Sequence, residues 1–159
     1  MLALLACSME QKTVNHYPRW VGDIEHQIGL DADTFVPCHG DDNVYQYFNL
    51  LQGMQFEGEK IGLERYFRER YKPVKSRQSG WIRIRFMVNC KGETGRFRIL
   101  ESNENYKERA FDTRIAQQLL ALTKSLKGWE ILTKNNKPID YYQYITFKIT
   151  NGQIEAILP

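Results

Sequence analysis

The densest group of chemically versatile side chains is the stretch Cys38-His39-Gly40-Asp41-Asp42. A cysteine beside a histidine could form a nucleophile pair, and thiolate, imidazole and carboxylate groups are all metal ligands. Adjacent Cys and His side chains rarely point at the same atom, however, and the sequence has no second ligand pair at zinc-site spacing. The pattern therefore favours a turn with a capping aspartate. Since phosphate-loop, serine-elbow and paired-histidine motifs are also missing from the sequence, we expect no enzyme activity, metal or cofactor.

A second group combines basic and aromatic residues at the two-residue spacing of a strand. Such a sheet face could stack bases and pair phosphates, dock an acidic peptide or a glycan, or simply be solvated, with Arg stems shielding the strands. The formal net charge of +3 is too small to argue for nucleic acid. We therefore favour a protein partner for this face, and the predicted partner-binding residues are Arg83, Arg85, Arg96, Arg98, Tyr142, Tyr144 and Lys148.

The three cysteines are Cys7, Cys38 and Cys90. In an oxidising compartment Cys38 and Cys90 could pair, closing a loop of about fifty residues. Two buried free thiols are the alternative, since free cysteine is a common core residue. We carry the Cys38–Cys90 disulfide forward as a prediction.

The N-terminus resembles the lipobox of bacterial lipoproteins. Leu4-Leu5-Ala6-Cys7 follows an apolar start and is succeeded at once by polar Ser8. The resemblance implies that residues 1–7 are the remnant of a lipoprotein signal, that Cys7 carries the lipid, and that translation starts upstream of Met1. The alternative is a frayed apolar N-terminus of a cytosolic protein. No run of eighteen apolar residues occurs, so we expect no membrane-spanning helix in this sequence.

Hydrophobic periodicity predicts helices and strands from residue 42 onward. Ile82, Ile84, Phe86 and Val88 alternate strictly with Trp81, Arg83, Arg85 and Met87, as in a strand with one buried face. Lys124 and Lys127 complement the C-terminal dipole of the last predicted helix, which Gly128 ends. The predicted helices are 42–52, 59–71 and 111–127, and the predicted strands are 81–89, 95–101, 141–150 and 153–158.

This order predicts an α+β fold, with a three- to four-stranded antiparallel sheet and two or three helices on one face. The other face is expected to be open to water, as antiparallel sheets permit. Residues 8–57 would form an N-terminal extension with one helix, and residues 58–159 the α+β domain.

From about residue 58 to residue 149, the chain resembles the C-terminal domain of TonB-type energy transducers. The matching features are Leu63-Glu64-Arg65-Tyr66-Phe67 before Tyr71-Lys72-Pro73, the alternation from Gly80 to Val88, the turn Lys91-Gly92-Glu93, Ser102, Gly128-Trp129, and Ile145-x-Phe147-x-Ile149. The resemblance implies a domain that binds an extended peptide at an exposed strand edge.

The chain departs from that family in having no transmembrane helix and no Pro-rich spacer, since it has only five Pro. We therefore predict a stand-alone periplasmic lipoprotein, anchored to the outer membrane, that binds an envelope protein or peptide, with an outer-membrane transporter as one candidate. The alternative is a cytosolic nucleic-acid-binding module that uses the Arg/Tyr face.

Overall fold

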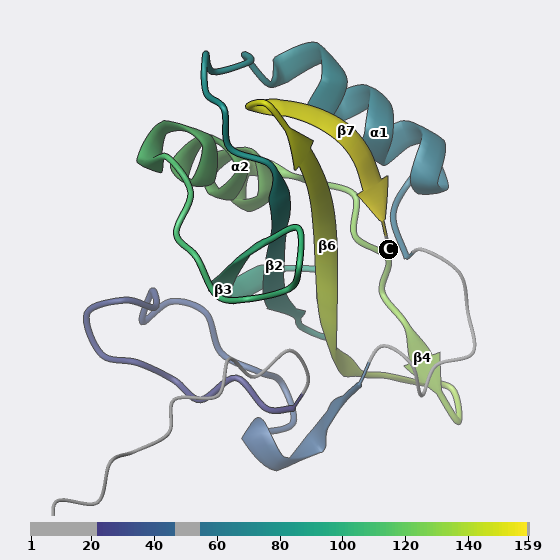
Figure 1. Ribbon diagram of the computed structural model, residues 1–159. Coiled ribbons are helices and arrows are strands. Elements are labelled where there is room, and N and C mark those ends of the chain that lie inside the picture. The colour runs from purple at the N-terminus through teal and green to yellow at the C-terminus, as the bar shows by residue number, and fades with distance from the viewer. Residues whose placement is uncertain (1–21, 47–54, 159) are drawn as a thin grey trace, which may run out of the picture.

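The computed structural model describes residues 22–46 and 55–158 and gives an α+β fold, with a mixed sheet and two α-helices (Figure 1). The two long central strands are β2 (Gly80–Val88) and β6 (Asp140–Thr150), which pair antiparallel. The outer neighbour of β2 is β3 (Thr94–Asn103), also antiparallel. Within the described residues the sheet order is β1-β6-β2-β3, with β7 (Gln153–Leu158) also paired to β6.

Strict alternation explains the central hairpin, because residues two apart share one face of a strand. Ile82 and Ile84 are fully buried on the helix-covered face, and they lie opposite Phe147 and Ile145 of β6. A register shift between Arg85 and Met87 sets two β3 residues against one β2 residue. At the β6–β7 turn, Asn151 and Gly152 both have positive φ, as a two-residue hairpin turn requires.

Both α-helices bury an apolar stripe in the same core. Helix α1 (Glu59–Arg70) contributes Leu63 and Phe67, and helix α2 (Thr113–Ser125) contributes Ile115 and Leu119. The Phe67 ring meets the Phe147 ring edge-on, with 4.7 Å between centroids. Asp112 begins α2 by accepting the Arg114 backbone N–H at 2.9 Å.

Three short elements complete the described fold. Strand β1 (Val44–Tyr45) follows a 3₁₀ turn at Asp41–Asn43 and pairs parallel with the start of β6. Strands β4 (Thr133–Lys134) and β5 (Lys137–Pro138) form a small separate hairpin around Asn135-Asn136.

These short elements correct the sequence expectations. The predicted helix 42–52 is wrong over its described part, which is a 3₁₀ turn and a strand, while residues 47–52 lie outside the described residues. The sheet is mixed rather than purely antiparallel, because β1 runs parallel to β6. The two other predicted helices and the four predicted strands are confirmed, with small changes at their ends.

Candidate functional site

The sheet face opposite the helices is covered at one end by the chain's own N-terminal segment, residues 22–45 (Figure 1). Ile24 packs there with Met87 and Tyr142, and the Tyr142 hydroxyl accepts the Ile24 backbone N–H at 3.3 Å. The ring of Phe35 lies where a side chain on Gly95 would be, so only glycine allows this contact. The expectation of a face open to water is therefore wrong at this end of the sheet.

Three of the predicted partner-binding arginines fasten this segment. Arg98 donates to both carboxylate oxygens of Asp31, at 2.7 and 2.6 Å, and to the Glu25 carbonyl at 2.7 Å. Arg96 donates to the Ile24 carbonyl at 3.2 Å and pairs with Asp41 at 2.8 Å, and Arg85 donates to the Gly22 carbonyl. Arg85 and Arg96 are 5% and 7% exposed, so their guanidinium groups serve the fold.

The other predicted residues of this face lie toward its opposite end. Arg83 donates to the Thr146 hydroxyl at 3.1 Å and lies 4.5 Å from the centroid of the Tyr144 ring. Burial lowers the pKa of Arg83, which is the usual effect of removing a cation from water. Lys148 pairs with Glu155 at 2.5 Å. A partner-binding role for the seven residues stays a prediction.

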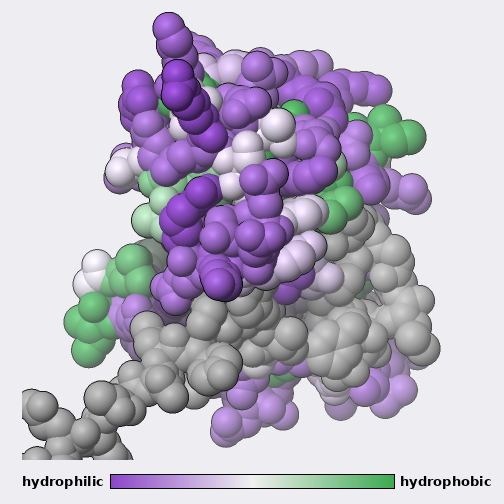
Figure 2. Space-filling model, viewed as in Figure 1, coloured by the Kyte–Doolittle hydropathy of each residue, from purple (hydrophilic) through white to green (hydrophobic). Residues whose placement is uncertain are grey.

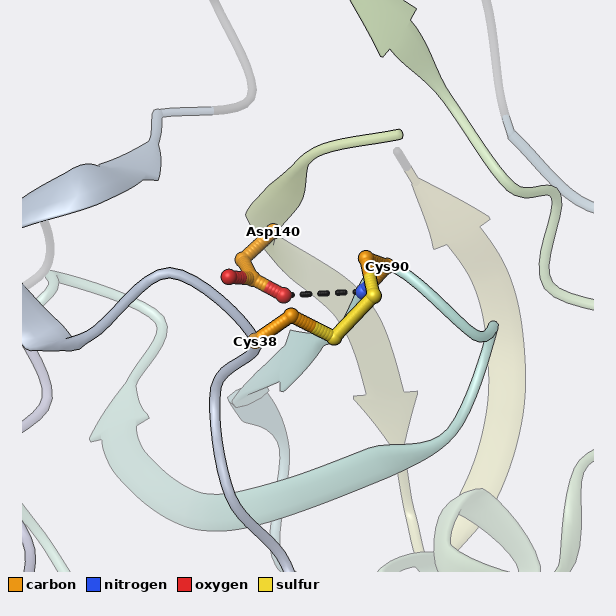
Figure 3. A group of neighbouring side chains, drawn as sticks. All are labelled: Cys38, Cys90 and Asp140. Carbon is orange, nitrogen blue, oxygen red and sulfur yellow. Dashed lines mark hydrogen bonds between the residues drawn. A yellow bond between two sulfur atoms is a disulfide. The ribbon is translucent and has the colours of Figure 1, made fainter. Parts of the chain in front are cut away.

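A disulfide joins the N-terminal segment to the end of β2. Cys38 and Cys90 are bonded, with 5.9 Å between their Cα atoms, so the predicted pairing is confirmed. Figure 3 shows the buried carboxylate of Asp140 beside this bond, with Oδ1 accepting the Cys90 backbone N–H at 2.8 Å. The other oxygen, Oδ2, accepts the His39 backbone N–H at 2.8 Å and lies 3.1 Å from His39 Nδ1.

The disulfide also decides what Cys38 can do chemically. The ligand atoms of Cys38, Cys90 and Asp140 lie within 4.8 Å of one another, which is close enough for a metal site. Since the two sulfurs are bonded to each other, neither is a thiolate ligand or nucleophile in this state. Cys7 and His16 lie outside the described residues, and His26 lies 3.8 Å from Asp31.

The outer edge of β3 is the candidate recognition element. Near its end, the Glu101 carbonyl accepts the Arg109 N–H at 3.2 Å, and the Asn103 N–H donates to the Lys107 carbonyl at 2.9 Å. Backbone groups two residues apart point the same way, so those of Ile99 also point outward. Among the described residues, β3 pairs with β2 alone, and the outward groups of Ile99 have no backbone partner.

A groove of about 580 Å³ lies along the start of this edge. Its walls are residues 30–35 of the N-terminal segment, residues 92–97 of the β2–β3 hairpin, and residues 124–127 after α2. Lys124 and Lys127 are exposed, and no carboxylate of the described residues pairs with them. Lys124 lies 5.7 Å from the centroid of the Phe97 ring. The groove thus joins a strand edge, apolar walls and two cationic side chains.

The exposed apolar residues support this location. Figure 2 shows a mostly hydrophilic surface in which the apolar residues form small, separate patches, one of them over the loop of the N-terminal segment. In this loop, Ile28 is 94% exposed, and Leu30 is also exposed and lines the groove. A peptide that fills the groove could therefore bury apolar surface at its rim.

Comparisons of this chain with models of protein families, with curated proteins and with solved structures gave no match. Within the described residues, no helix has both the length and the apolar character to cross a membrane. The argument for function therefore rests on the geometry of the sheet edge, the groove and the covered face.

Proposed function

We propose that this chain is a cell-envelope protein that binds an extended segment of a partner protein along the outer edge of β3. The observation that carries the proposal is the combination of outward backbone groups at Ile99 with the adjoining groove. An edge strand presents unpaired N–H and C=O groups, so an incoming peptide can add as a further strand. The side chains of the peptide would then enter the groove or point to solvent in alternation.

The outer edge of β3 is a better candidate than that of β7. Strand β7 is shorter, with six residues against ten. Its pairing with β6 shifts register between Lys148 and Ile149, and Arg68 already donates to the Glu155 carbonyl at 3.4 Å. A peptide added there would meet an interrupted ladder.

The charge of the groove favours an acidic peptide. Asp31 is neutralised by Arg98, and Glu93 accepts the Asn89 amide at 2.7 Å, whereas Lys124 and Lys127 keep their charges available. A Glu or Asp side chain, or a terminal carboxylate, would complement these two lysines. The ligand we propose is therefore an extended segment that carries negative charge beside its strand-forming part.

The envelope location belongs to the same proposal. Structural disulfides are typical of exported proteins, and the Cys38–Cys90 bond fits that setting. A lipid on Cys7, attachment to the outer membrane, the likeness to TonB C-terminal domains and an outer-membrane transporter as partner remain proposals of the sequence. The nucleic-acid alternative is less favoured, since Arg85, Arg96 and Arg98 bind the chain's own carbonyl and carboxylate groups.

The test begins with a displayed library of random peptides, selected on the intact, oxidised chain. Peptides from this selection are then made with single N-methylated amides, which lose one hydrogen-bond donor each. Strand addition predicts that methylation weakens binding at alternate positions only. It also predicts that the Ile99 amide, which exchanges with solvent in the free protein, becomes protected when the peptide binds.

Two matched variants locate the site. The double variant Lys124→Gln/Lys127→Gln is expected to weaken an acidic peptide about tenfold, because charge-assisted contacts are lost. The control, Lys134→Gln/Lys137→Gln, removes the same charge at the β4–β5 hairpin and should leave the affinity unchanged. Equal sensitivity at every methylated position, or an unprotected Ile99 amide, would refute strand addition at β3.

A further inference from the structure

A second concave site lies at the opposite edge of the sheet, between the β4–β5 hairpin and the segment that leads into β1. Its volume is about 470 Å³. The lining is rich in hydrogen-bond donors and includes an aromatic ring, with His39, Asn43, Tyr45, Lys134, Asn135 and Lys137. These residues are separate from the β3 groove, so this site is independent of the proposed peptide binding.

The two lysines of this pocket oppose each other in a way that costs stability. Lys134 and Lys137 are direct partners in the antiparallel pairing of β4 with β5. Like charges directly opposite each other in a ladder repel. Lys134 lies 4.4 Å from the centroid of the Tyr45 ring, and neither lysine has a carboxylate partner in the described parts of the chain. A local arrangement that costs stability is typical of a functional site, and here an anion would relieve the repulsion.

A third donor is held in place by a buried carboxylate. The oxygen Oδ2 of Asp140 binds both the backbone N–H and the Nδ1 of His39, which fixes the orientation of the imidazole ring. The His39 side chain is 47% exposed, and within residues 22–46 and 55–158 no partner is found for its Nε2. The Asn43 side chain donates to the His39 carbonyl at 2.8 Å, which fixes the pocket wall.

We propose that this pocket binds the phosphate group of a phosphate monoester through Lys134, Lys137 and His39. A phosphate group offers three strong acceptor oxygens, which match these donors better than the two oxygens of a carboxylate. Lysine binds phosphate as a point charge, and the pair brings two such charges to one side of the pocket. The phosphate would belong either to a small soluble molecule or to a lipid headgroup.

The experiment uses the full, oxidised chain and two probes. Binding of glycerol 3-phosphate is followed by calorimetry, and binding to vesicles that contain phosphatidic acid is measured against vesicles of phosphatidylcholine alone. Binding to the soluble probe supports a soluble ligand, and binding only to phosphatidic acid vesicles supports a headgroup. Failure of both probes would overturn the proposal.

Matched variants separate this site from the groove. Lys134→Gln/Lys137→Gln should weaken the phosphate probe about a hundredfold, at about tenfold for each charge-assisted contact, and His39→Gln about tenfold. Lys124→Gln/Lys127→Gln, which removes the same charge at the groove, should bind the probe like the wild type. The first variant should melt no lower than the wild type without ligand, because the repulsion is gone. Wild-type binding by that variant, or displacement of the probe by acetate at equal ionic strength, would overturn the assignment.

Discussion

Reduction of the Cys38–Cys90 disulfide should lower the free energy of unfolding by about 4 kcal/mol. The two residues are 52 positions apart, so the bond removes loop entropy from the unfolded chain. For a loop of that size the chain-entropy relation gives about 14 cal/mol/K, which is about 4 kcal/mol at room temperature. A domain of this size typically has about 5–15 kcal/mol of stability, so the reduced protein would be marginal.

The measurement is urea unfolding of the same chain, oxidised and reduced, in a Cys7→Ser background that prevents exchange with a third thiol. With a slope of about 2 kcal/mol/M, the midpoint should fall by about 2 M on reduction. The double variant Cys38→Ser/Cys90→Ser should match the reduced protein, because Cys38 is exposed and Cys90 half-buried, so serine is tolerated at both. A loss below about 1 kcal/mol in both comparisons would refute the reasoning from loop entropy.

Two further predictions concern carboxylates that hold the N-terminal segment. Asp140→Asn should cost about 2–3 kcal/mol in urea unfolding, because an amide cannot accept both the Cys90 and the His39 N–H groups; stability equal to that of the exposed control Asp33→Asn would contradict this. Asp31 has a pKa below its ordinary 3.8, held down chiefly by the hydrogen bonds from Arg98, so its contribution to stability is present above about pH 4 and is lost as the pH falls through the lowered pKa. Between about pH 5 and pH 2, Asp31→Asn should therefore lose less stability than the wild type or Asp33→Asn, and parallel pH profiles would rule the assignment out.

The regular part of the fold could be predicted because its residues obey simple periods. The alternation from Ile82 to Val88 produces a strand with one buried face, and the Asn151-Gly152 pair adopts the positive φ angles of a tight hairpin. The stripe through Ile115 and Leu119 gives α2 its buried side. Each of these patterns is local, and the core contacts that they predict follow from a single buried face per element.

The short elements could not be predicted in the same way. Val44 and Tyr45 form a two-residue strand, which is too short for any period to show. The spacing of Val44, Tyr47 and Phe48 satisfied a helical template, yet Val44 belongs to a parallel pair with Asp140, nearly a hundred positions along the chain. Long-range pairing outweighs local preference when the segment is short.

The covered sheet face was missed for a different reason. Arg85, Arg96 and Arg98 have the spacing of a solvated or ligand-binding face, and their partners are mostly backbone carbonyls 60 to 70 positions earlier. Every residue has a backbone carbonyl, so no side-chain pattern reveals such a partner. Lys124 and Lys127 were likewise explained by the helix dipole alone, although the structure places them on the β3 groove.

The use of the arginines in the fold also changes where recognition should be sought. A buried guanidinium loses its water, so its cost is met only if its donors find acceptors, and here the N-terminal segment supplies them. With that face occupied, the described sheet offers a partner mainly its edges, and an edge is read through the backbone. Substitution of Arg96 or Arg98 should therefore act first on stability, through release of the segment. Substitutions at the groove should act on affinity, because Lys124 and Lys127 are exposed and support no buried contact.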